Sequence, residues 1–186
     1  MKKKIIIILS SIILVVIVLI ACFFIFFQNS DELTYIAKSN SMNPGISLGD
    51  ELIYKKIQDK SEIITYVLGN ASDYKKFGDY GDVIIYHPYG DNNCEKILHR
   101  AICWIQYHDE YSTYSVGEYD QNNVTSITIS ELGLDEYKPD HSGYITKGDN
   151  NPSCDQLHTS LCSEPIKVEW IFGKVISHKL LALEKN

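Results

Sequence analysis

The chain has 186 residues, of which 45% are hydrophobic and 22% are charged, and its formal net charge is −7. All 24 acidic residues lie in residues 28–186, where 14 lysines and arginines leave a formal charge of −10. Nucleic-acid binding needs basic surface that neutralises phosphates, so this composition argues against a nucleic-acid partner. A segment of this size can form one domain with its own hydrophobic core.

An uncharged run of 23 residues, residues 5–27, follows three lysines near the N-terminus. As a helix it would measure roughly 35 Å, enough to cross a bilayer core of about 30 Å. By the positive-inside bias, residues 1–4 form a cytoplasmic basic tip and residues 28–186 are exported. Because no second apolar run follows, we expect a single-pass protein of the cell membrane or of an endoplasmic-reticulum-type membrane.

Two other interpretations of the apolar run are weighed against a retained anchor. A cleaved secretory signal has an apolar core of about 7–15 residues that ends in a small-x-small site. Here residues 23–27 continue the apolar stretch, and no good small-x-small site follows. Residues 19–22 look like a lipobox, but lipidated cysteines normally begin a polar tether. We therefore interpret residues 5–27 as a transmembrane helix.

Beyond the anchor, short apolar segments alternate with Gly, Asn and Asp turns, which is typical of a mainly β domain. The predicted strands are residues 51–54, 83–86, 97–107, 142–146 and 168–176. A turn signal at residues 89–93 predicts a hairpin between the second and third of these strands. We expect a loop with a short helix at residues 58–80 and an insertion at about 107–140 with a strand at 125–129.

The exported segment allows disulfides, and its four cysteines permit three pairings. These cysteines are Cys94, Cys103, Cys154 and Cys162. The first two are the least favoured pair, because nine strand steps would separate them by about 30 Å. The last two would close a short polar loop, although the connectivity stays open. No C-x-x-C pair occurs, so we predict no zinc site and no cofactor.

Two glycosylation sequons begin at Asn70 and Asn123. Such sequons are acceptors in secreted proteins when they lie on the surface. We therefore expect both asparagines in exposed, exported loops.

Three kinds of residue could carry chemistry, although each has a simpler structural explanation. Ser41 lies among turn formers only 14 positions after the apolar run, where a loop serine is the ordinary interpretation. His99 lies in the predicted strand 97–107, where alternation would place it on an apolar face as a core histidine. Asp149 and Asp155 lie in a turn-rich segment, where aspartates often bond their own backbone.

Taken together and in this order, the blocks around these residues resemble type I signal peptidases of the archaeal and endoplasmic-reticulum branch. The blocks are residues 39–44 with 49–50, residues 81–86, residues 97–100, residues 144–151 with Asp155, and the terminal residues 173–175. The resemblance covers the anchor and most of residues 39–176, apart from residues 58–77 and 107–140. It implies a signal-peptidase-like β-sheet catalytic domain behind one N-terminal transmembrane helix.

The resemblance also implies a role for each matching residue. Ser41 matches the nucleophile, and His99 stands where the bacterial branch has its lysine base. Asp155 matches the acid that orients the histidine and Asp149 a supporting carboxylate, although which of the two contacts His99 stays open. Ser39 matches the residue that assists the Ser41 N–H at the oxyanion. These types suit acyl transfer, because a serine hydroxyl needs an adjacent base to become nucleophilic.

One departure from the family lies beside the nucleophile. Asn40 occupies a position where the family usually has glycine. Asparagine tolerates left-handed dihedrals better than most residues, so we expect the turn to be kept.

The implied function is a membrane-anchored serine endopeptidase that removes N-terminal signal peptides from exported preproteins and cleaves after small residues at positions −1 and −3. We expect the substrate to bind as an extended strand along an exposed sheet edge. The implied partners are preprotein signal peptides and the lipid bilayer, with a secretion translocon as a further candidate. The alternative is a catalytically silent, membrane-anchored β domain that acts as a binding or assembly subunit of a secretion complex.

Overall fold

The computed structural model of the chain describes residues 15–18, 33–108, 110, 113–116, 130–158 and 160–179, with the backbone alone at 113 and 114. The chain divides into two compact units, Met1–Glu32 and Leu33–Asn186. In the first unit residues 15–18 are helical. Within the described ranges, no helix has the length and apolar character needed to cross a bilayer. The rest of the predicted span and its basic tip lie outside these ranges.

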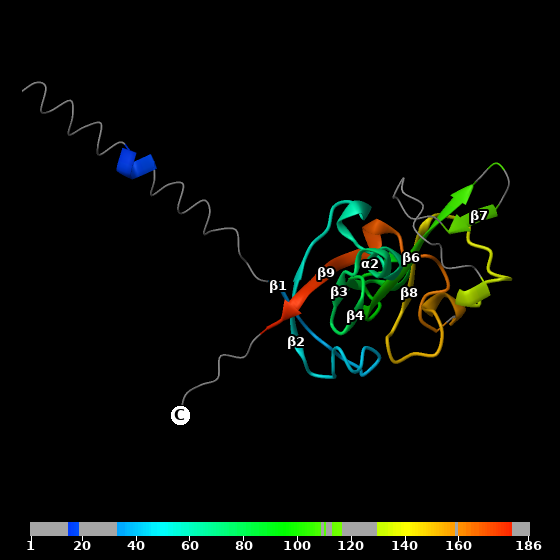
Figure 1. The fold of residues 1–186 in the computed structure, drawn as a ribbon, viewed down its shortest axis with the longest axis horizontal. Helices are drawn as coiled ribbons and strands as arrows, with labels where there is room; N and C mark the ends of the chain where they lie inside the picture. The colour runs from blue at the N-terminus through cyan, green and yellow to red at the C-terminus, as the bar shows by residue number, and fades with distance from the viewer. Residues whose placement is uncertain are drawn as a thin grey trace, which may run out of the picture. The chain divides into compact units, whose positions relative to one another are not determined.

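The second unit is mainly β, as the sequence predicts (Figure 1). Its strands are β1 (Leu33–Ile36), β2 (Glu51–Lys55), β3 (Lys75–Lys76), β4 (Asp79–Tyr80), β5 (Val83–Tyr86), β6 (Ile97–His108), β7 (Thr113–Val116), β8 (Gly143–Lys147) and β9 (Ile171–His178). Its helices are α2 (Tyr66–Ser72) and the short 3₁₀ turns η1 (Lys60–Glu62), η2 (Pro88–Gly90), η4 (Ser130–Leu132), η5 (Asp155–Leu157) and η6 (Val168–Trp170).

Seven strands form one antiparallel sheet in the order β1-β2-β9-β5-β6-β7, and β8 also pairs with β6. The predicted hairpin between β5 and β6 is confirmed, with Ile84 opposite His99. The long strand β6 pairs with β5 at its start, with β8 in its middle and with β7 at its end. Residues 97–99 therefore pair with β5 alone, whereas Arg100 lies between β5 and β8, opposite Val83 and Lys147.

Buried side chains hold the loop after β1 against the sheet. Met42 and Ile46 are buried in one hydrophobic cluster with Leu52, Val83 and Val175, which lie on β2, β5 and β9. Burying a side chain of this size contributes about 1.5–3 kcal/mol relative to its exposure. The loop that contains Ser41 is therefore fixed to the core by its immediate neighbour Met42.

Strand boundaries differ from the prediction mainly at β9. The predicted strand 168–176 begins with the turn η6, and the strand itself starts at Ile171, opposite Tyr86 at the end of β5. The sequence of a β-prone run does not indicate where its partner strand ends. The predicted start of β9 was therefore three residues too early. The helix expected in residues 58–80 is present as α2, whereas β1 and the small β3–β4 hairpin were not predicted. The strand expected at residues 125–129 lies outside the described ranges.

Strict alternation along β6 was also an incorrect expectation. The pairing with β8 shifts register between Ala101 and Cys103, which marks a β-bulge or similar irregularity. Ala101 packs in one hydrophobic cluster, whereas Ile102, Cys103 and Ile105 pack together in another. A bulge re-aims the side chains that follow it. His99 lies before the bulge and is buried, with 4% of its surface exposed.

The Cys154–Cys162 pairing that the sequence allowed is absent, because Cys94, Cys103, Cys154 and Cys162 are all free thiols. Cys154 packs in the cluster with Val67 and Cys103, whereas Cys162 packs in the cluster with Tyr86. The two sulfurs are thus separated into different parts of the core. Asn70 is exposed as expected but lies in α2 and not in a loop, and Asn123 lies outside the described ranges.

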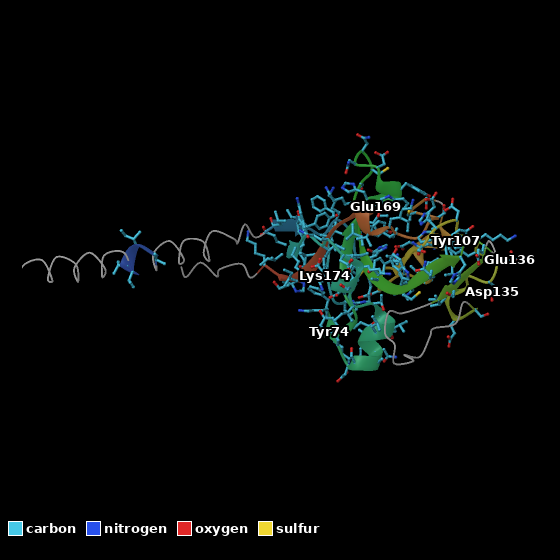
Figure 2. All side chains as sticks on the ribbon, turned by 90° about the horizontal axis from the view of Figure 1, so that it is seen from above. Tyr74, Tyr107, Asp135, Glu136, Glu169 and Lys174 are labelled. Carbon is cyan, nitrogen blue, oxygen red and sulfur yellow. The ribbon has the colours of Figure 1, made fainter. Side chains whose placement is uncertain are left out.

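A buried carboxylate organises the start of β5. Asp82 accepts hydrogen bonds from the Ile64 N–H at 2.8 Å, the Tyr74 hydroxyl at 2.9 Å and the Lys174 ammonium at 3.0 Å. Tyr74 and Lys174 are both labelled in Figure 2, which shows them on the β domain. The preceding Gly81 has φ +76°, and a Cβ there would lie 2.5 Å from the backbone of Thr65. The Gly81-Asp82 block is therefore a structural anchor for the sheet.

Candidate active site

Ser41 lies in the loop of residues 37–50 that joins β1 to β2. Its own side chain is half-buried while the adjacent Met42 is buried in the core. The Asn43 N–H donates to the Asn40 carbonyl at 3.1 Å, and the Leu48 N–H donates to the Asn40 Oδ1 at 3.0 Å. Asn40 has no positive φ, so the turn needs no left-handed residue. The Asn40 side chain instead holds the loop together by accepting the hydrogen bond from Leu48.

Ser41, His99 and Asp155 form one continuous hydrogen-bonded chain. The Ser41 Oγ lies 2.9 Å from the His99 Nε2, and the His99 Nδ1 lies 2.7 Å from the Asp155 Oδ2. Three separate elements bring them together, namely the β1–β2 loop, β6 and the first residue of η5. Of the two candidate acids, Asp155 contacts His99.

Asp155 is fully buried and accepts two further hydrogen bonds through the same oxygen. The Thr146 hydroxyl donates to its Oδ2 at 2.7 Å, and the Tyr86 hydroxyl donates to it at 2.9 Å. Burial is the largest single influence and raises the pKa of Asp155, but the donors His99, Thr146 and Tyr86 outweigh it and leave the pKa below its usual value. Burial beside this carboxylate also raises the pKa of Tyr86 far above its ordinary range.

The proton positions follow from this environment. A carboxylate with a lowered pKa only accepts hydrogen bonds at neutral pH, so the His99 Nδ1 must carry the proton that it shares with Asp155. In a neutral imidazole the other nitrogen is then an acceptor. The Ser41 hydroxyl therefore donates to the His99 Nε2. This is the arrangement in which a histidine can remove a serine proton.

Ser39 lies beside the Ser41 hydroxyl. Their Oγ atoms are 3.0 Å apart, and the Ser41 N–H donates to the Ser39 Oγ over a longer 3.4 Å. Because the Ser41 proton points to His99, the Ser39 hydroxyl is the donor between the two serines. The Ser39 O–H and the Ser41 N–H are thus two polar groups next to the Ser41 Oγ, which is the position expected for oxyanion donors.

Asp149 does not contact His99 and instead pairs with the next residue of β6. The Arg100 Nε donates to the Asp149 Oδ1 at 2.8 Å, and the Arg100 Nη2 donates to its Oδ2 at 2.5 Å. The Arg100 Nη1 donates to backbone carbonyls of the β3–β4 hairpin and of the residue after it, including those of Tyr80 and Gly81. Arg100 is buried, so this bidentate pair is a structural clamp between the hairpin and residues 147–149.

The clamped segment reaches the backbone of Ser41. The Asn150 N–H donates to the Ser41 carbonyl at 2.8 Å. A Cβ at Gly148 would lie 2.7 Å from the same carbonyl oxygen, so only glycine allows this close approach. Asp149 therefore supports the site indirectly, by holding the segment that contacts Ser41.

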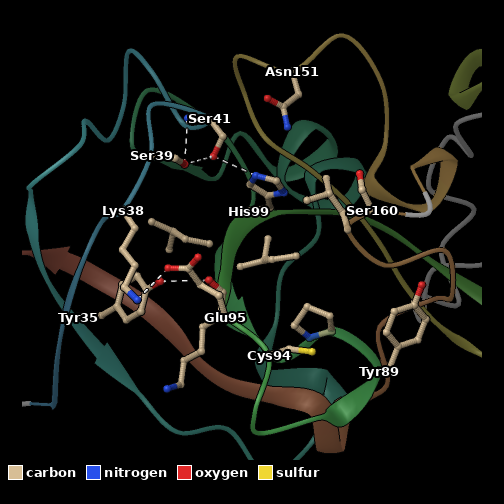
Figure 3. A pocket seen from close by; sticks show the side chains of 15 residues that line it. Tyr35, Lys38, Ser39, Ser41, Tyr89, Cys94, Glu95, His99, Asn151 and Ser160 are labelled. Atoms are coloured by element: carbon tan, nitrogen blue, oxygen red, sulfur yellow. Dashed lines mark hydrogen bonds and ion pairs between the residues drawn. The ribbon is translucent and has the colours of Figure 1, made fainter.

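An open cleft of about 550 Å³ lies beside the Ser41–His99 pair (Figure 3). One wall comes from β1 and the loop after it, with Tyr35, Lys38, Ser39 and Ser41. The opposite wall comes from residues 94–99 at the start of β6, and Pro88, Tyr89, Asn151, Ser160 and Leu161 complete the lining. The volume and open shape suit a segment of polypeptide.

Two residues that bond the acid were not anticipated from the sequence. Tyr86 and Thr146 lie at or near the ends of β5 and β8 and resemble ordinary core positions in those strands. The only available signal was a hydroxyl within an otherwise apolar run, which needs a partner when it is buried. Within the described ranges, no group of three or more His, Cys, Asp or Glu side chains could hold a metal ion.

No known protein-family model matches this chain, and no curated protein matches it. The family resemblance accordingly rests on the residues of the blocks themselves. The spatial arrangement of Ser41, His99 and Asp155 is the observation to which a function can be attached.

Proposed function

We propose that the chain is a membrane-anchored serine endopeptidase of the type I signal peptidase class, which removes N-terminal signal peptides from exported preproteins. The observation that carries this proposal is the hydrogen-bonded chain from Ser41 through His99 to Asp155 at the edge of an open cleft. Cys94, in the same cleft, has a pKa raised by burial and by Asp91 and lacks a histidine partner, so Ser41 is the better nucleophile.

The arrangement supports the following acyl transfer. His99 removes the Ser41 proton as the Oγ attacks the scissile carbonyl, and the Asp155 carboxylate stabilises the imidazolium that forms. The Ser41 N–H and the Ser39 O–H, which in the free protein donate to the Ser39 Oγ and the Ser41 Oγ, then donate to the developing oxyanion, where such donors contribute roughly 3–4 kcal/mol each. His99 returns the proton to the leaving amine, and water later releases the acyl group by the same route.

The edge strand β1 supports an extended substrate. It is the terminal strand of the sheet, with β2 on one side and no partner on the other among the residues described. Tyr35 of this strand lines the cleft, and the chain continues directly into Ser39 and Ser41. A peptide that pairs with this edge would be led past Ser41 by its backbone hydrogen bonds. Small pockets near Ser41 would then select small residues at positions −1 and −3.

The deciding experiment is cleavage of a preprotein by the full chain in detergent or liposomes. We expect the wild type to cleave at the signal-peptide junction, and Ser41→Ala and His99→Ala to lose this cleavage. A substrate series with Ala, Leu or Trp at position −1 tests the preference for small residues. Equal cleavage of the three would contradict that preference.

The control is Lys179→Ala, which removes an ion pair with Glu51 that does not line the cleft and should cleave like the wild type. If Ser41→Ala retains the activity, the proposed nucleophile is wrong. If the wild type binds preproteins without cleaving them, the silent binding or assembly subunit becomes the better account.

A further inference from the structure

Two oppositely charged side chains face each other in the cleft beside Ser41 (Figure 3). The Lys38 Nζ lies 2.8 Å from the Glu95 Oε1, and both residues line the cleft. Lys38 is three residues before Ser41, whereas Glu95 is four residues before His99. The pair therefore connects the two walls that supply the nucleophile and the base, so a peptide that lies in the cleft must pass it.

The pair is open to exchange with a substrate. Its side chains are 60% and 68% exposed, and neither forms another ion pair within the described ranges. Exposed pairs of this kind contribute only about 0–1 kcal/mol to stability. A substrate group that pairs with Lys38 can thus replace Glu95 with little loss of folding free energy.

The local charge indicates which substrate group would do so. Lys96 also lines the cleft, although its ammonium lies 4.2 Å from the centre of the ring of Phe172, which does not line the cleft. Two lysines and one glutamate give this part of the cleft a positive balance, in an exported segment whose formal charge is −10. A carboxylate is therefore attracted to this part of the surface more than a second cation is.

We propose that Lys38 is a specificity-determining residue that binds a carboxylate side chain of the substrate, Asp or Glu, when that carboxylate displaces Glu95. This inference rests on the proposed peptidase function, because it assumes that the cleft binds a polypeptide. Glu95 acts as the internal competitor that occupies Lys38 when no substrate is bound. Removal of Glu95 should consequently strengthen the preference for acidic substrates, whereas removal of Lys38 should abolish it.

The test measures binding separately from cleavage. Labelled peptides that span a cleavage site, with one Asp or the isosteric Asn at successive positions around the scissile bond, are titrated against the full chain in detergent. The protein is Ser41→Ala, alone and combined with Lys38→Gln, Glu95→Gln or the control Lys75→Gln. Lys75 is also an exposed lysine paired with an aspartate, and it does not line the cleft.

At one position we expect Asp to bind about twofold more tightly than Asn, rising to about fivefold in Glu95→Gln and vanishing in Lys38→Gln. Lys75→Gln should keep the wild-type ratio, and added salt should reduce the preference. Equal binding of Asp and Asn peptides in Glu95→Gln at every position would overturn the inference, as would failure of every peptide to bind. Cleavage of the Asn peptide by the wild type would show in either case that the peptidase proposal survives.

Discussion

Two adjacent residues of β6 pair with two aspartates that lie six positions apart, and the pairs serve different purposes. His99 bonds Asp155 and continues to Ser41 in the cleft, whereas Arg100 bonds Asp149 and the carbonyls of the β3–β4 hairpin. Successive strand residues point to opposite faces, so one strand can deliver a reactive group and a structural clamp side by side. Within one strand, His99 therefore belongs to the candidate active site, whereas Arg100 holds the surrounding structure in place.

The largest expected effect distinguishes the two aspartates by activity. Asp155→Asn should lower the cleavage rate on the order of 10⁴-fold, because the amide disturbs the tautomer and cannot stabilise the imidazolium. Asp149→Asn removes no group that contacts His99 and should lower the rate far less at a temperature where it stays folded. Rates of preprotein cleavage at equal concentrations of folded protein make the comparison. Equal losses in the two variants would remove the distinction.

The next prediction compares the free energy of unfolding that is lost when a buried and an exposed ion pair are broken. Asp149→Ala leaves the buried Arg100 guanidinium without its counter-ion, and breaking a buried pair costs about 3–5 kcal/mol. The exposed Lys179–Glu51 pair is the matched control, and Lys179→Ala should cost at most about 1 kcal/mol. Denaturant unfolding of the full chain in detergent measures both losses. A cost for Asp149→Ala as small as the control would show that no clamp exists.

The smallest effect concerns the hydrogen bond from Tyr86 to Asp155. The folded pKa of Asp155 is lowered, so its contribution to stability is present above the unfolded pKa of about 3.9 and is lost as pH falls through the folded pKa. Tyr86→Phe removes one donor to the carboxylate, raises this folded pKa and should cost about 1.5–3 kcal/mol at neutral pH.

The free energy of unfolding, measured from neutral to acidic pH, tests this prediction. Acidification should remove less stability from Tyr86→Phe than from the wild type, because a folded pKa closer to the unfolded one leaves less of the Asp155 contribution to lose. Thr146→Val, which removes the second hydroxyl donor, should shift the profile in the same direction. Unchanged acid profiles in both variants would mean that these hydroxyls do not set the pKa of Asp155.

Much of the sheet could be predicted from local patterns, because β2, β5, β6 and β8 combine β-prone residues with a flanking Gly, Asn or Asp turn, whereas β1, β3, β4 and β7 were not predicted. Local patterns failed where the partner strand decides the outcome. The start of β9 depends on where β5 ends, and the bulge in β6 depends on its register with β8. The thiols of Cys154 and Cys162 lie in different clusters, which their short sequence separation conceals.

The site could not be assembled from spacing, since Ser41 and His99 are 58 positions apart and His99 and Asp155 are 56 apart. The family resemblance brought these residues together as candidates, and the geometry decided between the two aspartates. Both aspartates follow turn formers and look alike as sequence. Only the packing of β6 shows that one faces His99 and the other faces Arg100.

The central claim is that His99 makes Ser41 nucleophilic, and covalent labelling tests it without any assumption about substrate. The full chain in detergent is treated at neutral pH with a serine-directed fluorophosphonate, and the modified residue is located by peptide mass spectrometry. We expect one adduct on Ser41, absent from Ser41→Ala and strongly reduced in His99→Ala. A wild-type chain that stays unlabelled, or that is labelled equally in His99→Ala, would contradict the account.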